Sequence, residues 1–349
     1  MAASLQGSVV VVTGASSGIG RATALAFARR GANVVGAARR SEALDSLVRE
    51  CEAVGGAALA VTTDVTDEAA VEELARAAVE RFGGIDVWVN NAAVTSFGRF
   101  EETPSEVSRR VIETNLFGCL HGARAALRHF RQAGKGVLIN NASMVGKAGA
   151  PYLAAYTASK FAIVGFSESL RQELLLTNGE IKVSTILPAS IDTPLFQHAA
   201  NYTGRTPKPL RPIYGADQVA EAIVSCAEHP RREVYVGGAG AALSLLRHVS
   251  PALYEQMYAR QVDVDHFLDA PAPAQPGNVF EPTAEWTGVS GGWKAEGQAP
   301  DGALARAGVA ALVVALVGAL WLRSRGNGAA ARRALAGLAS GVTAGRAAG

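Results

Sequence analysis

The chain contains few of the residues that mark several common classes of protein. Its 349 residues include three cysteines, Cys51, Cys119 and Cys226, which are far apart and form no CxxC pair. This spacing argues against a disulfide framework and predicts three reduced thiols. Histidines such as His121 and His229 have no partners at metal-ligand spacing, so no metal site is expected.

An excess of charge of either sign is also absent. The 33 Lys and Arg residues nearly balance the 31 Asp and Glu residues, which leaves a formal net charge of +2. No basic stripe with interleaved aromatic residues appears in the sequence. We therefore expect no nucleic acid partner.

Long apolar runs are scarce, with one exception near the end of the chain. The first run, residues 9–12, is too short for the core of a signal peptide, so we expect a cytoplasmic catalytic domain. The exception runs from Ala307 to Leu322, is uncharged, and lies between Arg306 and Arg323. As a helix it would span about 24 Å, slightly less than a bilayer core of about 30 Å. We expect a membrane anchor, and the sequence leaves its orientation in the membrane open. The alternative is a buried or oligomer-forming helix.

Short apolar runs alternate with helical patterns as far as about residue 240. The runs are rich in Val and Ile and apolar on both faces, as in parallel strands covered by helices on both sides. The predicted strands are residues 8–13, 33–37, 57–62, 85–90, 136–140, 182–187 and 233–236. The predicted helices are residues 18–30, 42–54, 67–82, 105–132, 154–178 and 216–229. This alternation predicts an α/β fold with a Rossmann-type, doubly wound parallel sheet of about seven strands and a C-terminal helical extension.

The composition divides the chain into four predicted parts. Residues 1–245 form the dinucleotide-binding domain, and residues 246–300 form an extension with a helix at 247–269 and then a strap or linker rich in Pro and Gly. Phe280, Trp286 and Trp293 favour docking of that segment over a free linker. Residues 301–325 hold the hydrophobic helix, and residues 326–349 form an Ala/Gly/Arg-rich tail predicted to be disordered or weakly helical.

The stretch TGASSGIG, residues 13–20, follows the first predicted strand and opens a helix. A phosphate is bound by backbone N–H groups at a helix N-terminus, and large side chains would block its approach. Gly14 permits the tight turn, and Gly18 and Gly20 permit close approach of the backbone. The stretch therefore predicts a dinucleotide site, although a glycine turn alone can also be a tight connection.

The end of the second predicted strand suggests which dinucleotide is bound. The strand carries no acidic residue there and is followed by Arg39 and Arg40. A guanidinium group can pair with a 2′-phosphate, which a carboxylate would repel. We therefore expect NADP(H) to be favoured over NAD(H); the alternative is that the arginines only cap the loop.

A second stretch carries the candidate chemistry. Tyr156 and Lys160 are four residues apart and share one face of a predicted helix. Ser143 follows the predicted strand 136–140, at the edge of the sheet where ligands bind. A Tyr-x3-Lys pair alone is common, but together with the glycine turn and a serine at the next strand end it predicts a catalytic site.

Taken together, these motifs resemble the short-chain dehydrogenase/reductase family with its TGxxxGxG and YxxxK signatures. The matching elements are TGASSGIG (13–20), NNAA (90–93), Asn115, Ser143 and YTASK (156–160), within residues 5–240. The resemblance implies a Rossmann fold and hydride transfer between NADP and a carbonyl or alcohol. It implies cofactor contacts at Gly14, Ser16, Ser17, Gly18, Ile19, Gly20, Arg39, Arg40, Asp64, Val65, Asn90, Ala92, Tyr156, Lys160, Pro188, Ile191 and Thr193.

The same resemblance implies a role for each catalytic residue. Tyr156 would act as proton donor or acceptor, its pKa lowered by Lys160 and by the oxidised nicotinamide. Ser143 would hydrogen-bond the substrate oxygen, and Lys160 would also hold the nicotinamide ribose. Asn115 would fix a water that links Lys160 to solvent, and Thr193 would bind the nicotinamide carboxamide. Asp64 and Val65 would contact the adenine.

Two positions depart from the family pattern. Ala93 replaces the usual glycine of NNAG, a small change, and Ala189 replaces the glycine that usually follows the proline at 188. The added methyl group at Ala189 would lie near the nicotinamide and could tilt the loop there.

The expected substrate contacts are largely apolar. They are Val145, Leu153 and Phe196, together with Ser143 and Tyr156. No cluster of charges is present for a phosphate or carboxylate, which favours a lipophilic ketone, aldehyde or secondary alcohol.

Two other functions fit the sequence less well. A cofactor-binding regulatory or scaffold protein would not need Asn115, Ser143, Tyr156 and Lys160 together. A nucleotide-sugar epimerase would have a different glycine spacing. The long predicted helices 105–132 and 154–178 could form a dimer seam, as is usual in the resembled family, so a homodimer or homotetramer is expected.

Overall fold

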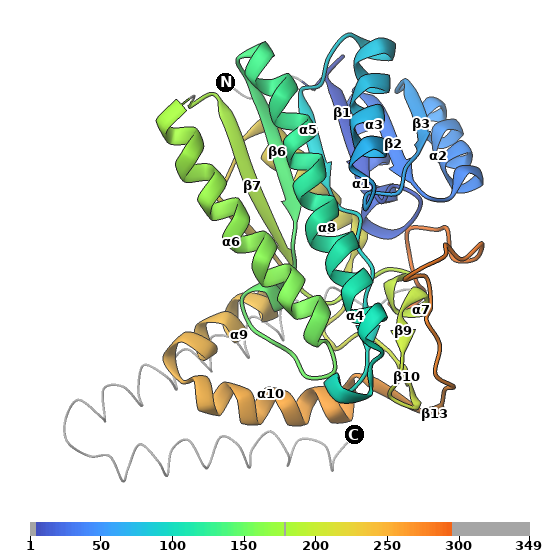
Figure 1. Ribbon diagram of the computed structural model, residues 1–349, viewed down its shortest axis with the longest axis vertical. Helices are drawn as coiled ribbons and strands as arrows, with labels where there is room; N and C mark the ends of the chain where they lie inside the picture. The colour runs from blue at the N-terminus through green and yellow to red at the C-terminus, as the bar shows by residue number, and fades with distance from the viewer. Residues whose placement is uncertain (1–4, 178, 295–349) are drawn as a thin grey trace, which may run out of the picture. The chain divides into compact units, whose positions relative to one another are not determined.

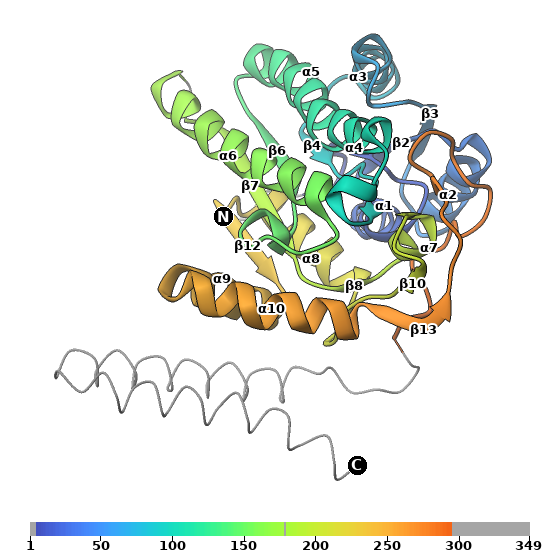
Figure 2. The ribbon, with the colours of Figure 1, turned by 60° about the horizontal axis from the view of Figure 1, so that its bottom comes forward.

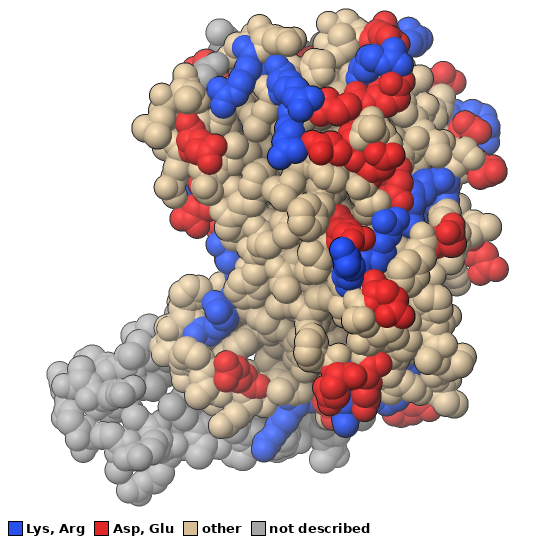
Figure 3. Space-filling model, viewed as in Figure 1, with Lys and Arg blue, Asp and Glu red and all other residues tan. Residues whose placement is uncertain are grey.

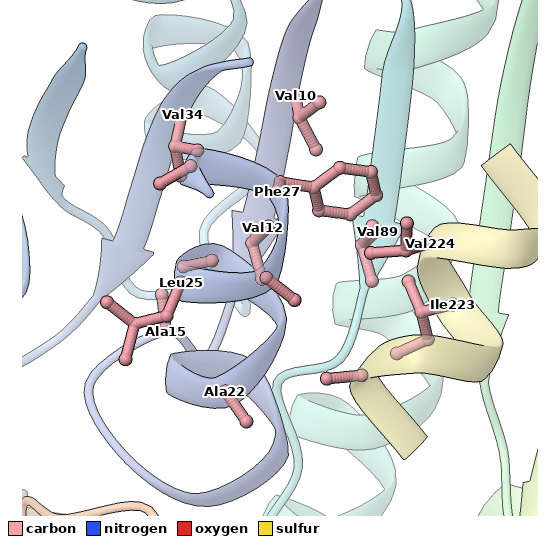
Figure 4. Close-up of a cluster of buried hydrophobic side chains, with 14 of the residues drawn as sticks. Val10, Val12, Ala15, Ala22, Leu25, Phe27, Val34, Val89, Ile223 and Val224 are labelled. Atoms are coloured by element: carbon pink, nitrogen blue, oxygen red, sulfur yellow. The ribbon is translucent and has the colours of Figure 1, made fainter. Parts of the chain in front are cut away.

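Four consecutive valines form most of the first strand, β1 (Val9–Thr13), and all four are buried. Val10 and Val12 belong to a cluster on one face of the sheet, and Val9 and Val11 belong to a cluster on the other face. Figure 4 shows Val10 and Val12 beside Phe27 and Val224 in the first of these clusters. The strand therefore lies between two helical layers, which explains why its sequence is apolar without alternation.

The central sheet has seven parallel strands in the order β12-β7-β6-β4-β1-β2-β3. Besides β1 these are β2 (Asn33–Ala38), β3 (Ala58–Thr62), β4 (Val87–Asn90), β6 (Gly136–Asn141), β7 (Ile181–Pro188) and β12 (Glu233–Val236). The seven predicted strands and the doubly wound fold class are confirmed. The strand order reverses between β1 and β4, and open α/β sheets bind ligands at such a switch point.

Helices cover both faces of the sheet (Figure 1). One layer contains α1 (Gly18–Ala28), α2 (Ser41–Ala53) and α8 (Ala216–Glu228). The other contains α3 (Glu68–Phe82), α5 (Gly118–Ala133) and α6 (Ala154–Thr177). The Asp67 carboxylate caps α3 by accepting a 2.9 Å hydrogen bond from Ala69 N, so this helix begins where its sequence predicts.

The second layer is also joined by ion pairs at its surface. Arg124 of α5 pairs with Glu68 of α3, and Arg128 pairs with Glu72. Figure 3 shows acidic and basic side chains interspersed over these two helices.

Two predicted helices have wrong boundaries. Residues 105–132 form α4 (Ser105–Ile112) and α5, separated by a π-helical turn, η2 (Glu113–Phe117). Residues 247–269 span the end of α9 (Gly238–Val249), all of α10 (Pro251–Asp265) and the start of strand β13 (Phe267–Pro271). The α9/α10 boundary falls at Ser250-Pro251, because proline is accepted at the start of a helix and not in its interior.

The remaining elements are short and lie between β4 and β13. They are β5 (Ser96–Phe97), η1 (Phe100–Glu102), η3 (Met144–Gly146), β8 (Ile191–Asp192), α7 (Leu195–His198), β9 (Ala200–Asn201), β10 (Arg205–Pro207) and β11 (Tyr214–Gly215). After β13 the chain continues without regular structure beside α7, as the orange coil in Figures 1 and 2.

The computed structural model describes residues 5–177 and 179–294. None of the helices in these ranges is both long and apolar enough to cross a membrane. The predicted anchor, Ala307 to Leu322, and the tail 326–349 lie outside the described residues.

Candidate active site

The glycine turn after β1 packs tightly against the loop after β4. Gly14 has φ +67°, and a Cβ atom there would lie 2.7 Å from Ala92 Cα. A side chain at Gly20 would clash with the Gly14 carbonyl oxygen. The turn therefore has room only for glycine at both positions. At the start of α1, Gly18 N donates a 3.0 Å hydrogen bond to Gly288 O.

Side chains of the two loops hold this arrangement. Thr13 Oγ1 accepts hydrogen bonds from Asn91 N (3.0 Å) and Ala92 N (3.1 Å). Asn91 Nδ2 donates to Thr13 O (2.9 Å), and Asn91 Oδ1 accepts from Asn141 Nδ2 (2.8 Å). The sequence analysis missed Asn91, although the Asn pair in NNAA was a signal for it. Its side chain connects the ends of β1, β4 and β6 at the switch point.

Asn90 lies on the other side of this loop. Its side chain accepts a hydrogen bond from Trp88 Nε1 (2.8 Å) and donates to Cys119 O (3.1 Å) and Asn140 Oδ1 (2.9 Å). Asn90 is buried in this network and does not line either of the cavities described below. Asn90 therefore stabilises the loop after β4 without contacting either cavity.

A cavity of about 80 Å³ lies beyond the ends of β2 and β3. Of the predicted cofactor residues it is lined by Gly14, Ser16, Arg39, Arg40, Asp64, Val65 and Ala92. Asp64 accepts hydrogen bonds from Thr66 and from Arg110 Nη2 (2.6 Å). Burial opposes ionisation of Asp64, but the Thr66 hydrogen bonds and the nearby Arg110 and Arg39 hold its pKa below the ordinary value.

The two arginines after β2 have different surroundings. Arg40 donates through Nε and Nη2 to Ser16 Oγ, through Nη2 to Ser17 Oγ, and through Nη1 to two backbone carbonyls, so all three of its nitrogens are engaged. Arg39 donates through Nη1 and Nη2 to one carbonyl each. Because a guanidinium group has five donors, Arg39 retains donors that a phosphate could use.

A second cavity, of about 200 Å³, extends from the glycine turn to the ends of β6 and β7. Three of the four predicted catalytic residues line it: Ser143, Tyr156 and Lys160. Ser143 follows β6, and the other two lie on α6. Lys160 is buried, its Nζ donates to Asn141 O (2.9 Å), and the same atom lies 5.5 Å from the centre of the Tyr156 ring.

Burial shifts both ionisable groups toward their neutral forms. It raises the pKa of Tyr156 to about 12, and a hydrogen bond with Ser143 opposes this shift. It lowers the pKa of Lys160 to about 8. Burial therefore sets the direction of the Tyr156 shift in the protein without cofactor. That Lys160 and the oxidised nicotinamide together lower this pKa stays a prediction.

Asn115 does not line this cavity. It lies in the π-helical turn, its Oδ1 accepts from Val94 N (2.8 Å), and its Nδ2 donates to Val94 O (3.0 Å) and to Ser159 Oγ (3.1 Å). Ser159 precedes Lys160, so Asn115 connects the loop after β4 to the helix that carries Tyr156 and Lys160.

The other predicted contacts fall at two ends of the same cavity. Ser17, Gly18, Ile19, Pro188, Ile191 and Thr193 line its cofactor end, and Val145, Leu153 and Phe196 line its apolar end. Gly20 is not among the lining residues and serves the turn. Ala189 also lines the cavity, and its N–H donates to Val236 O (2.9 Å), so its backbone still bonds to β12 despite the added methyl group.

The sequence analysis missed several residues of the apolar end. These are Phe97, Leu210, Tyr258 and His266. Phe97 and His266 rings meet edge to face at 5.1 Å between centroids. Burial lowers the pKa of His266, so the ring is neutral near pH 7. The last two residues belong to the C-terminal extension, where no motif in the sequence indicated a role.

A dinucleotide fits this combination of features. The N-terminus of α1 suits a pyrophosphate, the smaller cavity suits an adenosine, and the larger cavity brings the glycine turn close to Ser143 and Tyr156. Within residues 5–177 and 179–294 there is no cluster of His, Cys, Asp or Glu that could hold a metal ion.

Comparisons with known proteins agree with this geometry. Residues 8–203 match the short chain dehydrogenase family. The chain is 40% identical over 274 residues to an uncharacterized oxidoreductase, YxnA, of Bacillus subtilis, covering 78% of this chain and 76% of that protein. It is 34% identical over 226 residues to the 3-oxoacyl-[acyl-carrier-protein] reductase FabG of Thermotoga maritima, covering 64% of this chain and 91% of that protein.

Two solved structures are similar at 30% sequence identity. A short chain dehydrogenase/reductase from Burkholderia phymatum in complex with NAD gives a TM-score of 0.65 and covers 72% of this chain and 96% of its own. An alcohol dehydrogenase from Thermococcus sibiricus, complexed with 5-hydroxy-NADP, gives a TM-score of 0.57, with coverages of 66% and 95%. The match over more than half of the chain, with the parallel sheet and the shared cavity, shows that this protein belongs to the short-chain dehydrogenase/reductase family of oxidoreductases that act on CH–OH and C=O groups with NAD(P).

Proposed function

We propose that the protein is an NADP(H)-dependent oxidoreductase that transfers a hydride between the nicotinamide and a lipophilic ketone, aldehyde or secondary alcohol. One observation carries the proposal: Ser143, Tyr156 and Lys160 line the same cavity as Gly14 and Gly18 of the glycine turn. A proton donor, a hydrogen-bond donor and the glycine turn proposed to bind the dinucleotide thus line one cavity.

Each residue has a distinct task in this proposal. The nicotinamide, when bound, supplies or accepts the hydride. Tyr156 donates its proton to the substrate oxygen during reduction, and Ser143 hydrogen-bonds the same oxygen as negative charge develops on it. Lys160 holds positive charge near the phenol and carries donors for the nicotinamide ribose. Asn115 acts as a positioning residue for the helix that bears Lys160.

Tyr156 carries the proton that reduction of a carbonyl requires. A phenol is protonated at neutral pH, and burial raises the pKa of Tyr156 further, to about 12. Because a raised pKa also makes the phenol a weaker acid, we assign Lys160 and the bound nicotinamide the task of easing its ionisation.

The proposed substrate class follows from the apolar end of the larger cavity. Val145, Leu153, Phe196 and Phe97 offer apolar contacts, and the cavity lining includes no acidic residue and no arginine. Such a lining favours a lipophilic carbonyl compound over a phosphorylated or strongly ionic one.

The proposed preference for NADP(H) depends on Arg39. Its donors face the smaller cavity from the end of β2, whereas Arg40 braces the glycine turn. We expect Arg39→Ala to weaken NADPH binding by at least about tenfold and NADH binding by less than about threefold. Equal losses for both cofactors would contradict the preference.

Replacing Tyr156 by phenylalanine tests the proposal as a whole. We expect reduction of an aromatic or aliphatic ketone panel to slow by about 10²–10⁴-fold, with NADPH affinity and thermal stability near those of the parent protein. Tyr235→Phe, at a tyrosine outside both cavities, is the matched control and should retain full activity. Tight NADPH binding without turnover by the unaltered protein would favour a scaffold role instead.

We also propose a homodimer or homotetramer formed through α4, α5 and α6. Phe117 and the pair Leu175 and Leu176 are large apolar side chains exposed in or beside these helices. Light scattering of the purified protein measures the oligomeric state directly, and a monomer at micromolar concentration would refute this proposal. The cytoplasmic location of the catalytic domain and the membrane anchor remain predictions from the sequence.

A further inference from the structure

The segment after β13 crosses the cofactor side of the fold as an extended strap, here defined as residues 276–293. Its backbone carbonyls accept hydrogen bonds from both arginines of the adenosine cavity. Arg39 donates to Asn278 O (2.6 Å) and Phe280 O (2.7 Å), and Arg40 donates to Thr283 O (3.0 Å) and to Glu285 O (2.9 Å). The strap thus lies over the end of β2, where adenosine recognition is expected.

Part of the adenosine cavity is built from the strap itself. Asn278, Pro282 and Thr283 line it together with residues from the ends of β2 and β3. The buried atoms Asn278 Oδ1, Thr283 Oγ1 and Thr114 Oγ1 have no hydrogen-bond partner among the described residues, and all three residues line this cavity. Unpaired polar atoms at a cavity indicate a polar ligand, because burial without a partner costs free energy.

The far end of the strap is anchored on one buried carboxylate. Asp192 accepts hydrogen bonds from Ser290 Oγ (2.6 Å), Gly291 N (3.0 Å) and Trp293 N (2.9 Å). Gln197 adds a hydrogen bond from its Nε2 to Gly291 O (2.6 Å). Asp192 is the last residue of β8, and Gln197 lies in α7.

Between these two attachments the strap meets the glycine turn. Gly288 O accepts a 3.0 Å hydrogen bond from Gly18 N at the start of α1. That N–H belongs to the group of donors that a pyrophosphate would use. A dinucleotide therefore cannot take its place until the strap near Gly288 has moved.

We propose that the strap is a lid that closes over the adenosine half of the cofactor and forms one wall of its site. The lid opens to admit the dinucleotide and closes on it through the Arg39, Arg40 and Asp192 contacts, so that its stability sets the rate of cofactor release. This inference rests on the proposed function and adds a binding element that lies outside the matched residues 8–203.

Two glycines, one in the strap and one outside it, allow a matched test in the full chain. A Cβ atom at Gly291 would clash with the Thr193 carbonyl, so Gly291→Ala must lift the anchored end. A Cβ atom at Gly165, an open position of α6 outside the strap and both cavities, meets nothing within 4 Å, so Gly165→Ala leaves the lid in place. Ser290→Ala, which removes one donor to Asp192, is a second and milder opening variant.

The first measurement is the rate of NADPH dissociation. Stopped-flow fluorescence monitors it while excess NADP⁺ displaces the bound NADPH. We expect Gly291→Ala to release NADPH at least about tenfold faster and Ser290→Ala to release it about threefold to tenfold faster, with Gly165→Ala within about twofold of the parent protein. The second measurement is the affinity for 2′-phospho-ADP-ribose, which lacks the nicotinamide. The affinity of Gly291→Ala and Ser290→Ala for this compound should fall as their NADPH release becomes faster. A local disturbance of Thr193 alone would leave that affinity unchanged.

The outcomes separate the lid from the proposed function. If the parent protein binds NADPH but Gly291→Ala and Ser290→Ala release it at the parent rate, the lid is refuted and the oxidoreductase proposal stands. Tighter NADPH binding by the opening variants would show that the strap blocks the site instead of closing on the ligand. A parent protein that binds no NADPH would refute the proposed function itself.

Discussion

Replacing Lys160 by methionine should stabilise the protein near pH 7 while abolishing its activity. Lys160 is 3% exposed, and its Nζ donates to Asn141 O. Burial lowers its pKa from the ordinary 10.5 to about 8, and among the described residues no carboxylate offsets this shift. The buried ammonium group therefore lowers the stability of the folded protein, while the proposed reaction requires it.

The size of this cost follows from the two pKa values. The difference between 10.5 and about 8 corresponds to about 3 kcal/mol against the charged form in the folded state. Methionine has a similar shape without the charge, but it leaves Asn141 O without its hydrogen bond, which costs about 1–2 kcal/mol. We expect a net gain of about 1–2 kcal/mol in the free energy of unfolding near pH 7.

The gain should depend on pH in a defined direction. Below pH 8 the lysine is charged in both the folded and the unfolded state, so the full penalty applies. Between its folded pKa of about 8 and its unfolded value of 10.5, the folded lysine is neutral and the penalty shrinks as the pH rises. At pH 9.5 it should be about 1 kcal/mol, which cancels the advantage of methionine.

Urea unfolding of both proteins at pH 7 and pH 9.5 measures this difference. Lys135→Met, at an exposed lysine, is the control and should change stability little at either pH. The reasoning is refuted if Lys160→Met is less stable than the parent protein at pH 7, or if the difference between them is the same at both pH values. Carbonyl reduction, measured on the same samples, should fall to background.

Three further outcomes are expected. Gly20→Ala, whose methyl group would meet the Gly14 carbonyl, should destabilise by about 1–3 kcal/mol, whereas Gly165→Ala, in an open position of α6, should stabilise by about 0.5–1 kcal/mol in thermal unfolding. Asp67→Ala should cost about 1 kcal/mol by removing the cap of α3, and Asp67→Asn should restore most of it. The value of kcat/KM for reduction should fall as the pH rises through about 8, where Lys160 loses its proton; a flat profile from pH 6 to 10 would contradict this.

The sequence indicated the sheet and the catalytic triplet for identifiable reasons. Strands buried on both faces must be apolar throughout, so β1, β6 and β7 could be recognised from composition alone. The glycines of the turn and the four-residue spacing of Tyr156 and Lys160 are local requirements, and a local requirement leaves a pattern in the sequence. Neither needed knowledge of a distant segment.

Other features depended on contacts between distant residues. Helix 105–132 looks continuous because its apolar pattern continues through Asn115, and only the hydrogen bonds of Asn115 to Val94 and Ser159 reveal why a π-helical turn lies there. The spacing of Tyr156 and Lys160 does not show that burial raises the pKa of the phenol in the protein without cofactor. Burial depends on how all the surrounding elements pack, which no spacing of residues along the chain can report.

By itself, the sequence determined the doubly wound sheet, the position of the glycine turn and the identity of the residues available for proton transfer, because each depends on periodicity or on neighbours along the chain. Only the tertiary structure decided that Arg40 braces the turn while Arg39 keeps free donors, and that the strap lies across both of them. The strap and these arginines are more than 200 residues apart, and the contacts are made by backbone carbonyls. Every residue has such a carbonyl, so no side-chain pattern could have predicted the contact.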